Sequence, residues 1–81
     1  MRIHIKFFAR ARDLAGTSDF DLVTPNPCAV SDAKLLLLDH FPQLASVMPF
    51  LLIAVDGDYA SDQTPLRDGC ELACFPPVSG G

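Results

Sequence analysis

The chain is 81 residues long, and 49% of its residues are hydrophobic while 20% are charged. This length and composition are typical of one globular domain and exclude a disordered chain. Ten acidic residues against six basic ones give a formal net charge of −4. That balance argues against nucleic acid as a partner, because phosphate binding needs a clustered basic surface.

The cellular compartment is predicted from the thiols and the apolar runs. Cys28, Cys70 and Cys74 cannot all pair within one chain, so reduced thiols are expected. The first residues follow a strand pattern and lack the apolar region and cleavage site of a signal peptide. Every apolar run falls far below the ~20 residues that span a bilayer. We therefore expect a cytoplasmic protein that has no membrane partner.

The first quarter of the chain predicts a hairpin. Alternation over residues 2–8 (RIHIKFF) indicates a strand whose buried face carries Ile3, Ile5 and Phe7. The stretch ARARDLAG predicts a short helical turn that ends at Gly16. The alternating stretch SDFDLV, which follows it, predicts the second strand.

The middle of the chain predicts one amphipathic helix after a loop rich in proline. Four apolar residues follow the spacing of a single helix face, namely Val30, Ala33, Leu37 and Phe41. Ser31 is the predicted N-cap, although no Glu or Gln occupies the capping-box position. Pro42 ends the helix.

The last third predicts three strands separated by turns. FLLIAV is an apolar run of strand length, and the turn Asp56-Gly57 leads from it to a short strand near Tyr59. TPLRDG is a further turn, and CELACF is the last strand. Pro76 and Pro77 then end the pairing, because proline has no N–H to donate to a sheet.

The order β-β-α-β-β-β predicts an α+β domain of the ubiquitin-like β-grasp type. One helix must cover one face of a small mixed sheet, and the last strand is expected beside the first in the middle of that sheet. We assign residues 1–75 to the β-grasp domain and residues 76–81 to an extended C-terminal tail that ends in Gly-Gly.

Side-chain catalysis and metal binding are not predicted. Cys70 and Cys74 lie four residues apart on one strand, or about 13 Å at the usual rise, which is too far for a shared metal without a bend. They are interpreted as small apolar residues of the core. His4 and His40 are predicted at the surface, and the carboxylates are interpreted as scattered and solvated. The sequence contains no arrangement typical of a Ser-His-Asp triad.

A patch of aromatic residues is predicted on the face of the sheet that the helix leaves open. If Ile3, Ile5 and Phe7 face the helix, Phe8 faces the other way, and the same alternation puts Phe75 on the open face. The two rings would then lie together at the strand ends nearest the tail, with Tyr59 close by. In so small a protein, an uncovered apolar patch indicates a surface for a partner.

The tail has the chemistry of a reactive terminus. Pro76 and Pro77 favour extended geometry, and six residues reach at most about 20 Å, enough to enter a pocket in another protein. Gly80 and Gly81 have no Cβ and pass a constriction that a side chain would block. The terminal carboxylate is ionised at neutral pH and can attack the α-phosphate of ATP. The resulting acyl-adenylate could accept sulfur and become a thiocarboxylate.

These motifs resemble the small subunit of molybdopterin synthase, a family of ubiquitin-like sulfur carriers in molybdenum cofactor biosynthesis. The resemblance runs nearly end to end and depends on FFARARDLAG, the helix that ends at Pro42, AVDG, PLRDGCEL and FPPVSGG. Asp56 stands where this family often has Asn, and Cys70 stands where it often has Asp. Both positions lie in predicted turns.

The resemblance implies a function for Gly81. An adenylyltransferase related to the enzymes that activate ubiquitin would consume ATP to form a transient acyl-AMP on Gly81, which would then become a thiocarboxylate. The tail would enter the active site of the large synthase subunit and donate sulfur to a cyclic pyranopterin monophosphate. The small subunit would have no activity alone, no permanent cofactor and no metal. Two copies would sit at opposite ends of a large-subunit dimer as a heterotetramer.

The resemblance also implies which residues contact the large subunit. Phe8, Tyr59 and Phe75 fall where the family has hydrophobic contacts with its partner, in agreement with the argument from alternation. The remaining predicted partner-binding residues belong to the tail, namely Pro76, Pro77, Val78, Ser79 and Gly80.

Three other functions remain open from the residues alone. The chain could be a protein modifier whose Gly81 is joined to lysines of target proteins, as in ubiquitin. It could carry sulfur for another pathway, such as tRNA thiolation or cysteine synthesis. It could also be a β-grasp interaction module with an idle tail. A large synthase subunit encoded next to this chain would favour the synthase, and isopeptide-linked conjugates would favour the modifier.

Overall fold

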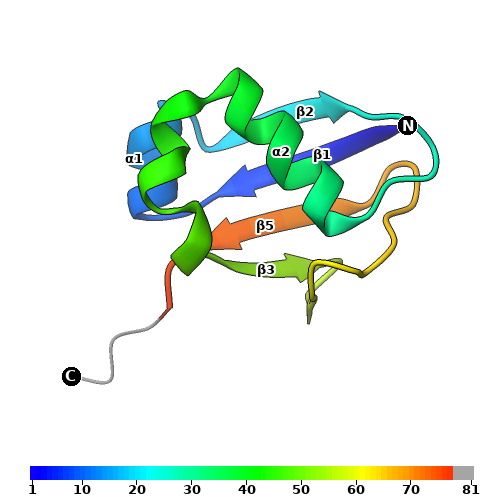
Figure 1. Cartoon of the computed structure of the whole chain (residues 1–81). Coiled ribbons are helices and arrows are strands. Elements are labelled where there is room, and N and C mark those ends of the chain that lie inside the picture. The colour runs from blue at the N-terminus through cyan, green and yellow to red at the C-terminus, as the bar shows by residue number, and fades with distance from the viewer. Residues whose placement is uncertain (78–81) are drawn as a thin grey trace.

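The structure is a computed structural model, and it describes residues 1–77 (Figure 1). The tail residues Val78, Ser79, Gly80 and Gly81 lie outside the described residues. Along the chain the elements are β1 (Arg2–Phe7), α1 (Arg10–Ala15), β2 (Asp19–Val23), α2 (Val30–His40), the 3₁₀ turns η1 (Pro42–Ser46) and η2 (Met48–Phe50), β3 (Leu52–Val55), β4 (Asp58–Tyr59) and β5 (Glu71–Phe75). No helix in residues 1–77 is long and apolar enough to cross a membrane.

The five strands form one mixed sheet in the order β2-β1-β5-β3-β4. β5 runs parallel to β1 and antiparallel to β3, whereas β1 and β2 form the antiparallel hairpin. Figure 1 shows α2 crossing one face of this sheet. The predicted β-grasp arrangement is therefore confirmed, with the last strand beside the first in the centre of the sheet.

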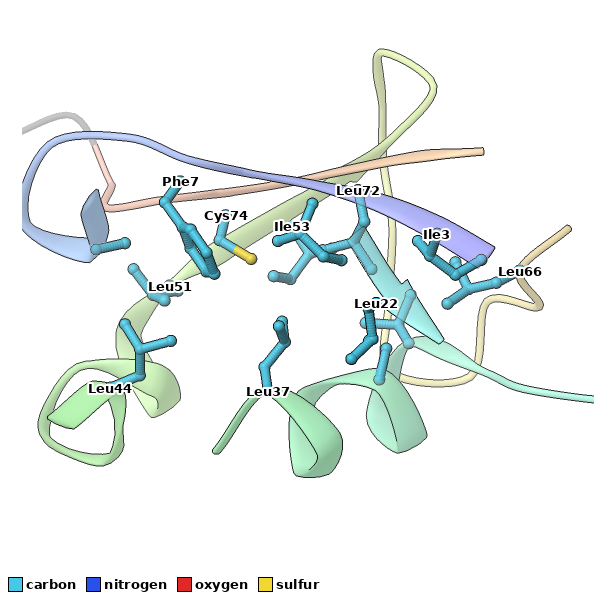
Figure 2. Packing of buried hydrophobic residues seen from close by; sticks show 14 of the residues in the cluster. Ile3, Phe7, Leu22, Leu37, Leu44, Leu51, Ile53, Leu66, Leu72 and Cys74 are labelled. Atoms are coloured by element: carbon cyan, nitrogen blue, oxygen red, sulfur yellow. The ribbon is translucent and has the colours of Figure 1, made fainter. Parts of the chain in front are cut away.

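The core lies between the sheet and the helical layer. In Figure 2, Phe7, Ile53, Leu72 and Cys74 extend from the sheet toward Leu37 on α2. All of these side chains are at most 4% exposed. The predicted buried face of β1 is confirmed, because Ile3 and Ile5 are also fully buried. Burying one large aliphatic or aromatic side chain contributes about 1.5–3 kcal/mol relative to leaving it exposed, so this face specifies the register of β1.

The tight turn between β3 and β4 depends on Asp56 and Gly57. Both residues have positive φ angles, 49° and 87°, which is the backbone conformation of the two-residue hairpin turns that Asp-Gly favours. The Asp56 carboxylate also accepts a hydrogen bond from the Glu71 backbone N–H at 2.9 Å. The turn is therefore joined to the start of β5, which explains why an acidic residue fits at this position.

The predicted N-cap of α2 is wrong. The helix begins one residue before Ser31, and Ala29 occupies the N-cap position in an extended conformation. The Asp32 carboxylate accepts a hydrogen bond from the Ala29 N–H at 2.9 Å, so an aspartate takes the place that Glu or Gln holds in a capping box. The Val30 N–H donates to the Thr64 carbonyl at 3.0 Å. A contact to a distant loop thus helps to decide where the helix begins.

The segment between α2 and β3 differs from the prediction in its detail. Pro42 ends α2 as predicted, but the chain continues through the two 3₁₀ turns η1 and η2. Only the last four residues of the apolar run FLLIAV are strand, because Phe50 still belongs to η2 and Leu51 is the C-cap of that turn. β3 therefore begins at Leu52.

Candidate docking face and tail base

The open face of β5 carries the side chains that alternation predicted. Leu72 and Cys74 are buried in the core, whereas Ala73 and Phe75 belong to the opposite face and are partly exposed. The rings of Phe75 and Tyr59 lie 6.0 Å apart between centroids at an interplanar angle of 49°. Such tilted aromatic pairs are favourable by about 0.5–1.5 kcal/mol beyond their buried area.

Phe8 directly follows β1. If the parallel pairing of β1 with β5 is extended by one residue, Phe8 lies beside Phe75. Phe7 pairs with Cys74, and the Phe8 N–H donates to the Cys74 carbonyl at 3.0 Å. The Phe8 side chain is 47% exposed. The next residue, Ala9, has a φ of 52°, a conformation that costs an alanine about 1–3 kcal/mol. This sharp turn leads the chain from β1 into α1 directly after Phe8.

Leu52 is a further large apolar residue of the open face, and the sequence pattern did not predict it. It pairs with Phe75 across β3 and β5 and is 37% exposed, while its neighbour Ile53 is buried. We call Phe8, Leu52, Tyr59 and Phe75 the apolar patch. The sequence could not assign Leu52 to a face because FLLIAV is uniformly apolar and shows no period of two.

The other half of the open face is charged and centres on His4. Its Nδ1 lies 3.0 Å from Asp21 Oδ1, and its Nε2 lies 3.0 Å from Asp19 Oδ1. A neutral imidazole can donate only one hydrogen bond, so two carboxylate partners favour the doubly protonated cation. The hydrogen bond to Asp21 is the largest cause that raises the pKa of His4 above 6.5, and the bond to Asp19 adds to it.

This arrangement corrects the prediction that the carboxylates are scattered. Asp19 and Asp21 face His4 across the β1–β2 pair, because Lys6 pairs with Asp19 and His4 with Asp21 in the register. The Ser18 hydroxyl is the largest cause that lowers the pKa of Asp19, and His4 lowers it further. A second ion pair, Lys6 with Glu71 at 3.7 Å, lies on the neighbouring strands. The predicted surface location of the two histidines is confirmed.

All three cysteines belong to the core, as predicted for Cys70 and Cys74. Cys28, Cys70 and Cys74 are at most 5% exposed and are unpaired. Burial raises the pKa of Cys74 to about 12, so this thiol is almost wholly protonated and a poor nucleophile at neutral pH. Within residues 1–77, no group of three or more His, Cys, Asp or Glu side chains could hold a metal ion.

The tail begins where the apolar patch ends. β5 ends at Phe75, Pro76 is half-buried, and Pro77 is exposed. The structure thus places the rings of Tyr59 and Phe75 together, with Phe8 and Pro76 at the same end of the sheet. The prediction that these residues bind a partner remains a prediction, as do the roles of Val78, Ser79, Gly80 and Gly81, which lie outside the described residues.

Proteins with the same fold and similar sequences are known. The molybdopterin synthase sulfur carrier subunits of Aedes aegypti and Arabidopsis thaliana are 35% and 33% identical to this chain. Both alignments cover 100% of the chain and 90% and 84% of the relatives. The crystal structure of SAMP1 from Haloferax volcanii superposes with a TM-score of 0.90 at 28% identity, covering both chains fully.

A further solved structure shares the fold at lower sequence identity. It is a complex of subunits 1 and 2 of the molybdopterin-converting factor from Helicobacter pylori, with a TM-score of 0.74, 22% identity and full coverage of both chains. Residues 5–81 match the ThiS family, a span that includes the C-terminal Gly-Gly. This match covers nearly the whole sequence, and the chain therefore belongs to the ThiS family.

Proposed function

We propose that this chain is the sulfur carrier subunit of a molybdopterin synthase. The observation that carries the proposal is similarity over the full chain to subunits of that name in insects and plants. The family match extends to residue 81 and so includes the Gly-Gly terminus on which carrier chemistry depends. The H. pylori structure with the same fold is a complex of two subunits, which supports a large subunit as the partner.

The proposed chemistry takes place on the carboxylate of Gly81. A carboxylate oxygen attacks the α-phosphate of ATP in an activating adenylyltransferase, and pyrophosphate leaves to give the acyl-adenylate. A sulfur nucleophile then adds to the acyl carbon and displaces AMP, which gives the thiocarboxylate. In the large subunit the thiocarboxylate sulfur attacks a side-chain carbon of the cyclic pyranopterin monophosphate, so that a carbon–sulfur bond forms as the bond from that carbon to oxygen breaks and the oxygen leaves. Hydrolysis of the resulting acyl–sulfur bond leaves sulfur on the pterin and returns the Gly81 carboxylate.

The small subunit contributes position rather than catalytic groups. The nearest thiol to the tail in sequence, Cys74, is fully buried, and its pKa is raised to about 12. The apolar patch beside the base of the tail instead supports a docking role, because burial of exposed aromatic side chains is the usual source of affinity at interfaces. We assign the patch to the large subunit and place the carrier in the cytoplasm, where the unpaired cysteines would remain reduced.

The test is the intact mass of the chain after incubation with ATP, an activating enzyme from the same genome and a sulfur source. We expect the mass increase for replacement of one oxygen by one sulfur, located at Gly81 by fragmentation. Omitting ATP is the control, and it should leave the mass unchanged. An unchanged mass with an activating enzyme that still forms the adenylate would contradict the proposal.

The second candidate function is that of a protein modifier. It is favoured by the superposition on SAMP1, which a related crystal structure describes as a small archaeal modifier protein. The two functions share the adenylate and separate afterwards. Isopeptide-linked conjugates that are lost on deletion of Gly81 would support the modifier. Transfer of labelled sulfur from Gly81 to the pterin in the presence of the large subunit would support the synthase.

A further inference from the structure

Six large hydrophobic side chains are exposed in residues 1–77, namely Phe8, Val23, Leu35, Phe50, Leu52 and Tyr59. Val23 and Leu35 lie away from the base of the tail, on β2 and on α2. Phe8, Leu52 and Tyr59 belong to the apolar patch. Phe50 is 70% exposed and comes from η2, which belongs to the layer that covers the other face of the sheet.

Phe50 lies close to the base of the tail. Two residues after Phe50, Leu52 pairs with Phe75, the last residue of β5. The backbone from Phe50 to Leu52 spans at most about 7 Å. Figure 1 shows the green segment that leads into β3 next to the point where the chain leaves β5. Phe50 therefore continues the apolar surface beyond the open face, around the end of the sheet.

The short tail limits how far the base of the tail can lie from the protein that binds Gly81. Pro77 is the last described residue, and Gly81 is the fourth residue after it. Four residues reach at most about 14 Å. A protein that holds the Gly81 carboxylate in its active site must therefore bring its surface close to Pro77. The side chains around the tail base then lie at that surface.

We propose that the docking surface extends from the apolar patch around the end of the sheet to Phe50, and that the protein which admits the tail covers Phe50 with an apolar surface of its own. This inference rests on the proposed function, since it takes the large synthase subunit as that protein. Phe50 presents a large apolar area to water in the free chain, and its burial would contribute in the same way as burial of the patch. A receptor that covers both must contact the carrier on two sides of the tail.

The test compares Phe50→Ala with Val23→Ala in a calorimetric titration against the large subunit from the same genome. Val23 is 69% exposed and pairs with Arg2 at the opposite end of β1, so it matches Phe50 in exposure but not in position. We expect Phe50→Ala to weaken binding about tenfold, which is about 1.4 kcal/mol, and Val23→Ala to leave the affinity within about twofold. Phe50→Leu keeps an apolar side chain and should retain most of the affinity.

Two different outcomes of the titration would contradict the extended docking surface and the proposed function. A loss of about fivefold or more with Phe50→Ala supports the surface, and a smaller loss overturns it. Absence of binding by the unmodified chain would instead contradict the proposed function. The exposed Phe50 ring is not needed for the core, so the variant should unfold at nearly the temperature of the unmodified chain. If it does not, Phe50→Gln, which removes the ring but keeps a long side chain, provides the same comparison.

Discussion

The two ring nitrogens of His4 each face a carboxylate, and this gives the protein a pH-dependent contact on its open face. The pKa of His4 is raised in the folded chain, first by its hydrogen bond with Asp21. The contribution of this contact to stability is therefore present below about pH 6.5, the usual pKa of histidine. It is lost as the pH rises through the higher pKa of the folded state. The contact is exposed to solvent, so its effect on stability is small.

An NMR titration of His4 tests this directly. Asp21→Asn should lower the pKa of His4, because it removes the carboxylate whose hydrogen bond contributes most to raising that pKa. Asp58→Asn, on β4 at the opposite edge of the sheet, should leave the pKa unchanged. Equal effects of the two variants would mean that the general charge of the protein, and not the pair of hydrogen bonds, sets the titration.

Asp19 gives the corresponding prediction on the acid side. Its pKa is lowered, first by the Ser18 hydroxyl and then by His4. A carboxylate with a lowered pKa contributes stability above its usual pKa, near 3.8, and this contribution is lost as the pH falls through the folded-state value. The hydrogen bond between Asp19 and His4 should therefore persist between about pH 4 and 6.5, where Asp19 is ionised and His4 is protonated.

The Cys74 thiol is expected to be unreactive toward alkylating reagents in the folded chain. Its pKa of about 12 makes the thiolate fraction at pH 8 smaller by roughly a thousandfold or more than that of an ordinary cysteine. Alkylation with iodoacetamide, read out by peptide mass, should label Cys74 in urea but not under native conditions. Rapid native labelling would show that the strand opens or that the thiol is accessible. The inertness matters for function, because sulfur on Gly81 then has no reactive thiol on β5 to which it could transfer.

At the scale of elements, the start of α2 depends on Asp32. Its carboxylate holds the Ala29 N–H and lies in the first turn, where the helix dipole favours negative charge. We expect Asp32→Ala to lower the free energy of unfolding by about 1 kcal/mol in urea denaturation. Asp39→Ala is the matched control, since Asp39 is exposed near the other end of the same helix, where the dipole disfavours a carboxylate. Equal losses from the two variants would contradict the capping role.

The strand β5 presents the central residue of the apolar patch. Phe75 contacts Tyr59 and pairs with Leu52, so its truncation removes the middle of the proposed interface. Phe75→Ala should weaken binding to the large subunit by about 2 kcal/mol or more in a calorimetric titration. Leu35→Ala, on the exposed side of α2, should not change the affinity. The patch assignment would be wrong if both variants bound like the unmodified chain.

At the scale of the whole molecule, folding and chemistry are expected to be separable. The core consists of residues from Ile3 to Cys74, whereas the proposed reacting group is the carboxylate of Gly81. Deletion of Gly81 should leave the unfolding temperature unchanged and abolish formation of the thiocarboxylate and transfer of sulfur. Thermal unfolding and intact mass measure the two effects on the same sample. Normal molybdopterin synthesis by the shortened chain would contradict the carrier function.

Much of this architecture follows from local patterns in the sequence. The period of two in residues 2–8 determined which face of β1 is buried, because a shift of one residue would expose Ile3, Ile5 and Phe7 together. The same period in β5 assigned Cys74 to the core and Phe75 to the open face. Asp56-Gly57 determined a tight turn, since few other residue pairs adopt its backbone angles. The family, too, could be predicted from motifs at both ends of the chain.

Other features were decided only by tertiary structure. Asp19 and Asp21 contact His4 because the β1–β2 register brings together residues that are 15 and 17 positions apart in the sequence. The local pattern of the sequence does not predict which side chains will face each other across two strands. Leu52 and Phe50 belong to a uniformly apolar run, so only the pairing with β5 decides which of its side chains are exposed. The start of α2 depends on Thr64, far along the chain. Local patterns reveal periodicity, whereas contacts between distant segments depend on how the strands and loops pack together.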